Sequence, residues 1–183
     1  MAPRELNSTA ASLLGFLHYG TQTGWDLMKM AETLIGDFWS LTRSQVYREL
    51  AAMEKRGLVE AGPTGRRDRR PYTLTDAGRA AFAAWAEQPP GGETIRFPLL
   101  LSVTFGSQLP PERLAAFLDE HERLHADRLA GYEQRRAEAT ADGGVPDPYV
   151  LATLDFGIHY ERAVLAWFAG LPDWMRDPAE QGA

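Results

Sequence analysis

The chain has 183 residues, of which 44% are hydrophobic and 24% are charged, a composition typical of a soluble globular protein. It contains no cysteine, which excludes disulfide bonds and thiolate metal sites and fits a reducing compartment. No apolar stretch approaches the roughly 20 residues that cross a bilayer, and no signal-peptide core follows the N-terminus. We therefore expect a cytoplasmic protein with no membrane partner.

The formal net charge of −6 is unevenly distributed along the chain. Residues 42–79 hold 9 Lys and Arg against 5 Asp and Glu, whereas residues 89–183 hold 8 against 15. Because phosphate binding depends on the local density of basic side chains, the overall acidity does not exclude DNA as a partner.

Two prolines and two glycines at residues 89–92 predict a linker between two domains, residues 1–88 and 93–183. In the first domain, helical periodicity and capping residues predict helices that begin near Ser8 or Thr9, at Gly24, at Thr42 and at Thr75. Two short β-like runs, residues 58–61 and 71–74, lie between the third and fourth helices.

An arginine-rich hairpin tip directly follows the third helix, which spans residues 42–56. A step of 100° per residue places Val46, Leu50 and Met53 on the core face and Ser44 and Arg48 on the opposite face. A helix followed by a basic hairpin is the arrangement by which a winged helix meets the major groove and the neighbouring phosphates. The candidate DNA-binding residues are Thr42, Arg43, Ser44, Gln45, Tyr47, Arg48, Arg66, Arg67, Arg69 and Arg70.

The second domain is predicted to be wholly helical. A short apolar segment at residues 98–105 precedes a long helix from residue 110 to about 139 and a last helix over residues 148–169. The long helix has a heptad-like stripe, made of Leu114, Phe117, Leu118, His121, Leu124, Arg128 and Tyr132. The last helix is apolar nearly all round, so we expect a partner subunit to cover part of it. The predicted fold class is mainly α with a small β-hairpin wing: a winged helix-turn-helix domain plus a helical dimerisation domain.

His121-Glu122-Arg123-Leu124-His125 matches the H-E-x-x-H pattern, which on a helix places two imidazoles on one face for zinc. No third-ligand motif follows at a familiar distance. We expect interface histidines rather than a metal site, and we predict no catalytic residue and no cofactor. A zinc-dependent hydrolase built on these residues is kept as an alternative.

Several aromatic residues of the second domain are candidates for binding a flat apolar effector by stacking. These are Phe97, Phe105, Phe156, Tyr160 and Trp167. The alternative for each ring is packing in the core or in a dimer interface.

Across residues 12–85 the sequence resembles the PadR-like family of transcriptional regulators. The resemblance rests on Leu13-Leu14-Gly15-Phe16-Leu17, Gly24-Trp25-Asp26-Leu27, Gln45-Val46-Tyr47-Arg48-Glu49-Leu50 and Arg70-Pro71-Tyr72-Thr73-Leu74-Thr75. Residues 97–101 and 157–162 resemble, more loosely, the subgroup with a long helical C-terminal domain. Arg48 departs from the residue that the family often has after the tyrosine, which implies a different base preference.

The resemblance implies a homodimeric repressor on an inverted-repeat operator, often released by a small aromatic or lipophilic molecule. The partners it implies are double-stranded DNA, a second copy of the chain and a small-molecule effector. Besides the hydrolase, one further alternative stays open, a winged-helix module whose wing arginines bind an acidic protein.

Overall fold

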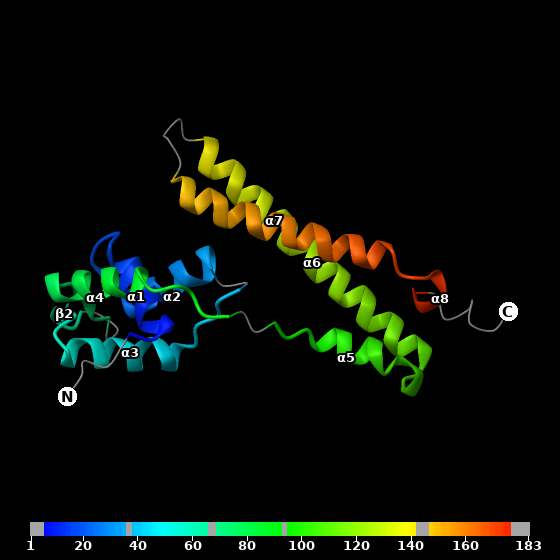
Figure 1. Cartoon of the computed structure of the whole chain (residues 1–183), viewed down its shortest axis with the longest axis horizontal. Helices are drawn as coiled ribbons and strands as arrows, with labels where there is room; N and C mark the ends of the chain where they lie inside the picture. The colour runs from blue at the N-terminus through cyan, green and yellow to red at the C-terminus, as the bar shows by residue number, and fades with distance from the viewer. Residues whose placement is uncertain (1–5, 36–37, 66–68, 93–94, 142–146, 177–183) are drawn as a thin grey trace. The chain divides into compact units, whose positions relative to one another are not determined.

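The computed structural model describes residues 6–35, 38–65, 69–92, 95–141 and 147–176. The chain divides into two compact units, residues 1–92 and 93–183 (Figure 1). Among the helices described, none is long and apolar enough to span a membrane.

The N-terminal unit is built around its first helix. α1 is buried on nearly every side, with Ala10, Leu13, Leu14 and Leu17 at most 2% exposed. The inward faces of the other helices and of the small sheet complete this core. The elements in chain order are α1 (Ser8–Leu17), β1 (Gln22–Thr23), α2 (Gly24–Leu34), α3 (Arg43–Lys55), β2 (Val59–Ala61), β3 (Pro71–Leu74) and α4 (Asp76–Ala86).

Short polar side chains fix where these helices begin. The side-chain oxygens of Thr23, Thr42 and Thr75 each accept a hydrogen bond from a backbone N–H in the first turn of α2, α3 and α4. For α1 the sequence predicted Ser8 or Thr9 as the cap, and neither is correct. Asn7, not Ser8, caps the helix, because its Oδ1 accepts from the N–H of Ala10 at 2.8 Å.

The sheet has three antiparallel strands in the order β1-β3-β2. The hairpin of β2 and β3 pairs Glu60 with Thr73, and β1 adds to the free edge of β3 by pairing Gln22 with Tyr72. The sequence did not predict β1, because two polar residues carry no alternating pattern. The added strand ties the start of α2 to the hairpin.

The C-terminal unit is a helical assembly dominated by two long helices. Its elements are α5 (Pro98–Thr104), a 3₁₀ turn (Gly106–Gln108), α6 (Pro111–Ala141), α7 (Pro148–Ala169) and α8 (Asp173–Arg176). α7 runs back along α6 in the opposite direction (Figure 1). Between the two helices Tyr132 lies on Gly157, and a β-carbon added there would be 2.5 Å from Cζ of the tyrosine ring.

The inward face of α6 differs from the predicted stripe at one position. Leu124 is 44% exposed, and the neighbouring His125 is buried instead, at 5%. Leu114, Leu118 and Tyr132 are buried as expected. One residue is a rotation of about 100° around a helix, so the inward face passes through His125 and turns Leu124 outwards.

Candidate nucleic-acid interface

The first turn of α3 is held by a reciprocal pair of hydrogen bonds between Thr42 and Gln45. Thr42 Oγ1 accepts from the Gln45 N–H at 3.3 Å, and Gln45 Oε1 accepts from the Thr42 N–H at 2.9 Å. The Thr42 hydroxyl also donates to Oε1 of Gln45, at 2.9 Å. Both residues were predicted to contact DNA. The structure gives them a second task, because this capping box stabilises the end of the helix that would enter a groove.

The two faces of α3 are as the periodicity predicted. Val46, Leu50 and Met53 are at most 1% exposed, while Ser44 and Arg48 lie on the solvent side. The Arg48 side chain is 67% exposed, and its Nε lies 3.7 Å from Oε1 of Glu49. That distance permits only a loose ion pair, so the guanidinium stays available to a ligand at the surface.

Tyr47 is positioned by contacts with Gly24 of α2 and with Arg43 of its own helix. Gly24, the first residue of α2, lies so close that an added β-carbon would be 2.8 Å from Cε1 of the ring. The guanidinium of Arg43 lies over the ring, 5.6 Å from its centroid. Tyr47 remains 38% exposed. Its ring therefore orients Arg43 while keeping a surface of its own.

Arg69 and Arg70, at the end of the arginine-rich tip, have different surroundings. Arg69 is exposed and lies over the indole of Trp25, with its Cζ 5.0 Å from the ring centroid. A stacked guanidinium keeps its N–H donors at the edges. The two other predicted tip residues, Arg66 and Arg67, lie outside the described residues.

Arg70 has partners within the fold that the sequence did not predict. Its Nη1 and Nη2 donate to the two carboxylate oxygens of Glu54 at 3.0 and 2.8 Å, and its Nε donates to the carbonyl of Gly62 at 3.3 Å. Glu54 lies near the end of α3, so this bidentate pair joins the helix to the hairpin. Arg70 thus anchors the hairpin to α3, and all three of its guanidinium nitrogens already donate hydrogen bonds within the fold.

Sequence reasoning missed three residues that shape this surface: Gly24, Trp25 and Glu54. Glu54 pairs across 16 positions, and no local pattern predicts such a contact. Of the three, only Trp25 is recognisable from its sequence context. It is a large aromatic residue next to a predicted helix start, where burial of the whole ring in the core is difficult. In the structure it is 46% exposed.

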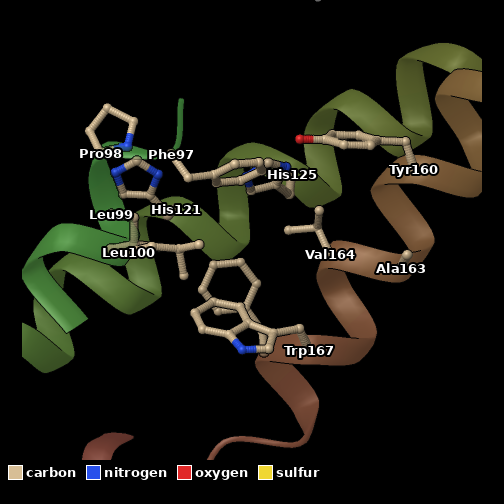
Figure 2. Close-up of a pocket in the computed structure, with 11 residues that line it drawn as sticks. Phe97, Pro98, Leu99, Leu100, His121, His125, Tyr160, Ala163, Val164 and Trp167 are labelled. Carbon is tan, nitrogen blue, oxygen red and sulfur yellow. The ribbon is translucent and has the colours of Figure 1, made fainter. Parts of the chain in front are cut away.

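The aromatic residues proposed for effector binding are only partly brought together. Phe97, Tyr160 and Trp167 line one cavity between α5, α6 and α7 (Figure 2). Phe156 stacks on Tyr160, with ring centroids 6.2 Å apart, but does not line the cavity. Phe105 is 60% exposed at the end of α5 and lies outside it.

Two residues of the H-E-x-x-H pattern on α6 have partners within the C-terminal unit. The His125 imidazole is bonded to the Glu161 carboxylate inside the unit, and Glu122 is paired with Arg176. Among the residues described, no group of three or more His, Cys, Asp or Glu is placed to hold a metal ion. The expectation that both histidines face a partner helix was wrong for His125, which is buried within its own chain.

Comparisons with known proteins agree with this geometry. The family model described as transcriptional regulator PadR-like matches residues 13–84, and the model described as virulence activator alpha, C-terminal, matches residues 95–169. The negative transcriptional regulator PadR of Bacillus subtilis is 29% identical over 157 residues, which cover 81% of this chain and 82% of that protein.

Solved structures extend the similarity to the fold. Bacillus subtilis PadR in complex with operator DNA superposes with a TM-score of 0.75 at 22% identity, over 90% of this chain and 96% of that one. The same protein in complex with p-coumaric acid gives 0.70 at 21%, over 94% and 99%. The Vibrio cholerae virulence activator AphA gives 0.70 at 27%, over 96% and 100%.

Proposed function

Because the chain belongs to the PadR-like family of DNA-binding transcriptional regulators, we propose that it acts as a homodimeric repressor on an inverted-repeat operator. It is a regulator and not an enzyme. The observation that carries the proposal is the exposed polar face of α3 beside the stacked Arg69 of the wing. A basic hairpin joined to a capped helix provides base contacts and phosphate contacts from neighbouring elements.

Within this proposal α3 enters the major groove. Arg48, whose side chain is 67% exposed, reads a base edge, and Ser44 allows the backbone to approach closely. Arg43 and Tyr47 contact the flanking phosphates. Thr42 and Gln45 hold the first turn of α3 in place. They also contact DNA through the hydrogen-bonding groups that the capping box does not use.

The wing contacts the sugar-phosphate backbone through Arg66, Arg67 and Arg69. Stacking on Trp25 restricts the Arg69 side chain before DNA arrives, which lowers the entropy lost on binding. Arg70 contributes by anchoring the hairpin to α3 through Glu54.

Dimer formation is supported by the apolar surface of the C-terminal unit. Leu101, Phe105, Tyr149 and Phe156 are between 60% and 82% exposed. A second copy that covers these side chains would remove them from water, at about 25 cal/mol per Å² of apolar area. A two-fold axis would then present two copies of α3 to half-sites about 34 Å apart, one turn of B-DNA.

We further propose that an aromatic or lipophilic effector releases the dimer from DNA. The Bacillus subtilis relative is a negative regulator. One of its structures is a complex with operator DNA and another is a complex with p-coumaric acid. If the effector changes the spacing of the two reading helices, a coupling free energy of about 1–3 kcal/mol is enough to shift the operator equilibrium.

Selection of bound duplexes from a random pool, followed by titration of the selected site, tests this proposal. We expect an inverted repeat and a steep fall of affinity with salt. Replacing Arg66, Arg67 and Arg69 by alanine should reduce the salt slope by about one for each phosphate that is no longer neutralised, and should leave the selected sequence unchanged. If the selection enriched no DNA sequence and the chain bound only an acidic protein, it would instead be a protein-interaction module.

A further inference from the structure

The segment that leads from β1 into α2 contacts both elements to which the proposed function assigns DNA binding. β1 pairs with β3 of the wing, and the hydroxyl of Thr21 lies 2.9 Å from that of Thr73 on the same strand. A few residues later, Gly24 lies against the ring of Tyr47 on α3. Residues 21–25, which we call the β1–α2 junction, therefore join the wing to the helix that enters the major groove.

Trp25, the last residue of the β1–α2 junction, supports the guanidinium of Arg69 at the tip of the wing. The Arg69 Cζ lies 5.0 Å from the centroid of the indole, and Trp25 remains 46% exposed. The backbone of Arg69 is fixed as well, because its carbonyl accepts a hydrogen bond from the Gly65 N–H at 2.7 Å. Both the backbone and the side chain of Arg69 thus have a defined position before any ligand binds.

The Arg69 guanidinium is oriented but not neutralised. Within the part of the chain that the structure describes, it makes no hydrogen bond and no ion pair, in contrast to Arg70. The carboxylate of Asp26, which interacts electrostatically with Arg69, is hydrogen-bonded to the hydroxyl and the N–H of Thr23 instead. A planar guanidinium that lies on a ring keeps the N–H donors at its edges available to an anion.

An arginine that is held in one position responds to the shape of DNA. The width of the minor groove and the path of the backbone depend on the base sequence, and the narrow groove of an A-tract concentrates negative potential. A mobile arginine follows the phosphates wherever they lie and therefore distinguishes little between DNA shapes. An arginine that is already fixed gains most from the DNA whose backbone lies where its guanidinium points.

We propose that Trp25 is a positioning residue for DNA recognition, which makes operator affinity depend on the shape of the DNA that flanks the bases read by α3. Trp25 acts through Arg69, because it holds the guanidinium at a fixed position relative to α3. The inverted repeat itself stays the same, since α3 reads it, and Arg69 discriminates only among its flanks. The inference rests on the proposed function and adds a specificity-determining residue outside both α3 and the wing.

Two other roles of Trp25 predict different results. If the stacking only stabilised the wing, removal of the ring would lower the affinity for every duplex by the same factor. If the indole itself contacted DNA, removal of the ring would weaken binding further in a chain that already lacks Arg69. A comparison of flanking sequences in single and double variants separates these roles.

The measured quantity is a ratio of two affinities, which we call the flank ratio. The full chain is titrated with the duplex selected from a random pool, flanked once by A-tracts and once by G·C-rich segments, with the inverted repeat kept identical. We expect the parent to prefer the A-tract duplex by about two- to fivefold, the size of one exposed cation–π contact. Partial unfolding of a variant lowers both affinities equally and leaves the flank ratio unchanged.

Trp25→Leu should bring the flank ratio close to one and leave the base preference within the inverted repeat unaltered. Trp25→Phe keeps a ring face and should restore part of the flank ratio. The matched control is Trp174→Leu, which removes a 50% exposed tryptophan from α8 of the C-terminal unit and should change neither quantity.

Substitutions of Arg69 give a second route that does not alter Trp25. Arg69→Lys keeps the charge but lacks the plane that lies on the indole, so it should lower the flank ratio and preserve the salt slope. In an Arg69→Ala background, Trp25→Leu should cause no further change in affinity or in the flank ratio.

Three results would each overturn the inference: a parent without flank preference, a preference that survives Trp25→Leu, or a further loss when Trp25→Leu is added to Arg69→Ala. A parent that binds the selected duplex but ignores its flanks leaves the regulatory function standing. If the parent enriches no sequence from the random pool, the proposed function fails and this inference fails with it.

Discussion

Gly24 lies directly against the ring of Tyr47, so that a β-carbon added to the glycine would be 2.8 Å from Cε1 and 2.9 Å from Cζ. The contact joins the first residue of α2 to the outer face of α3. Only a hydrogen atom at position 24 permits it, and through it α2 sets the direction of a side chain on the candidate DNA-binding face.

Gly24→Ala should weaken operator binding with little effect on folding. The exposed Tyr47 ring can swing aside into solvent, so the free energy of unfolding should change by less than about 1 kcal/mol. The displaced ring and the Arg43 stacked on it should then bind DNA less well, by about 1–2 kcal/mol. Urea unfolding and operator titration measure the two effects. Gly131→Ala, at an open position on α6, is the control and should leave binding unchanged. If Gly24→Ala weakened operator binding equally in a Tyr47→Ala background, the effect would not act through the Tyr47 ring.

Thr42→Ala and Thr23→Ala remove equivalent capping boxes from α3 and α2. Each should lower the free energy of unfolding by about 0.5–2 kcal/mol, because a first-turn N–H is left without its acceptor. Only Thr42→Ala should weaken operator binding beyond what the reduced stability explains. The comparison is made well below the melting temperature. Equal effects on binding would mean that the start of α3 does not meet DNA.

Arg48→Ala should lower operator affinity by about 1–3 kcal/mol and relax base preference at one position in each half-site. Lys55→Ala removes the same charge from the far end of α3 and should leave preference unaltered. Competition between the selected duplex and single-base variants measures both effects. A preference that survives Arg48→Ala would assign base reading to another residue.

Arg70→Ala should act on stability, and Arg69→Ala on DNA binding. Both side chains of the Arg70–Glu54 pair are more than a third exposed, so their coupling in a double-mutant cycle should be about 0.2–1 kcal/mol. Glu54→Ala should therefore make Arg70→Ala less harmful to folding. Arg69→Ala should leave the unfolding midpoint nearly unchanged and lower the salt slope by about one. If Arg69→Ala instead lowered stability and Arg70→Ala lowered the salt slope, Arg69 would be the anchor of the hairpin and Arg70 the phosphate contact.

The carboxylate of Asp26 should make the N-terminal unit less stable in acid. Hydrogen bonds from Thr23, at 2.6 Å from the hydroxyl and 3.0 Å from the backbone N–H, lower the pKa of Asp26, with burial opposing them and Arg69 assisting. The folded pKa lies below the unfolded value of about 3.9, so the stabilisation is complete above that value and disappears as the pH falls through the folded pKa. Asp26→Asn should therefore be less stable than the parent at pH 7 and equal to it in strong acid. Glu87→Gln, on an exposed side chain, controls for removal of a charge.

The helices of the N-terminal unit and the face of α3 could be predicted from the sequence because their signals are local. Periodic Val46, Leu50 and Met53 predict the buried side, and Thr42 and Thr75 predict two of the helix starts. The same reasoning treated all tip arginines alike. Local charge density says nothing about a carboxylate 16 residues away, so the anchoring role of Arg70 was not predictable.

The C-terminal unit shows the other limit. A heptad-like pattern indicated which side of α6 is buried but could not tell Leu124 from His125, which are one step apart. The burial of His125 is tolerated because Glu161, 36 residues further on, is hydrogen-bonded to its imidazole. Such a pair can be identified only in the folded structure, whereas the spacing of apolar residues can be read from the sequence.

The reciprocal cap between Thr42 and Gln45 restricts how this protein can be retargeted to a new sequence. Most residues at position 45 would remove the side-chain half of the capping box and weaken the first turn of α3, so a loss of binding in such clones could come from lost helix stability and not from changed specificity. A library that varies Ser44, Arg48 and Ala51, an exposed residue one turn after Arg48, and keeps Thr42 and Gln45 fixed avoids that problem. Engineering, and natural divergence as well, should find new specificities at those three surface positions first.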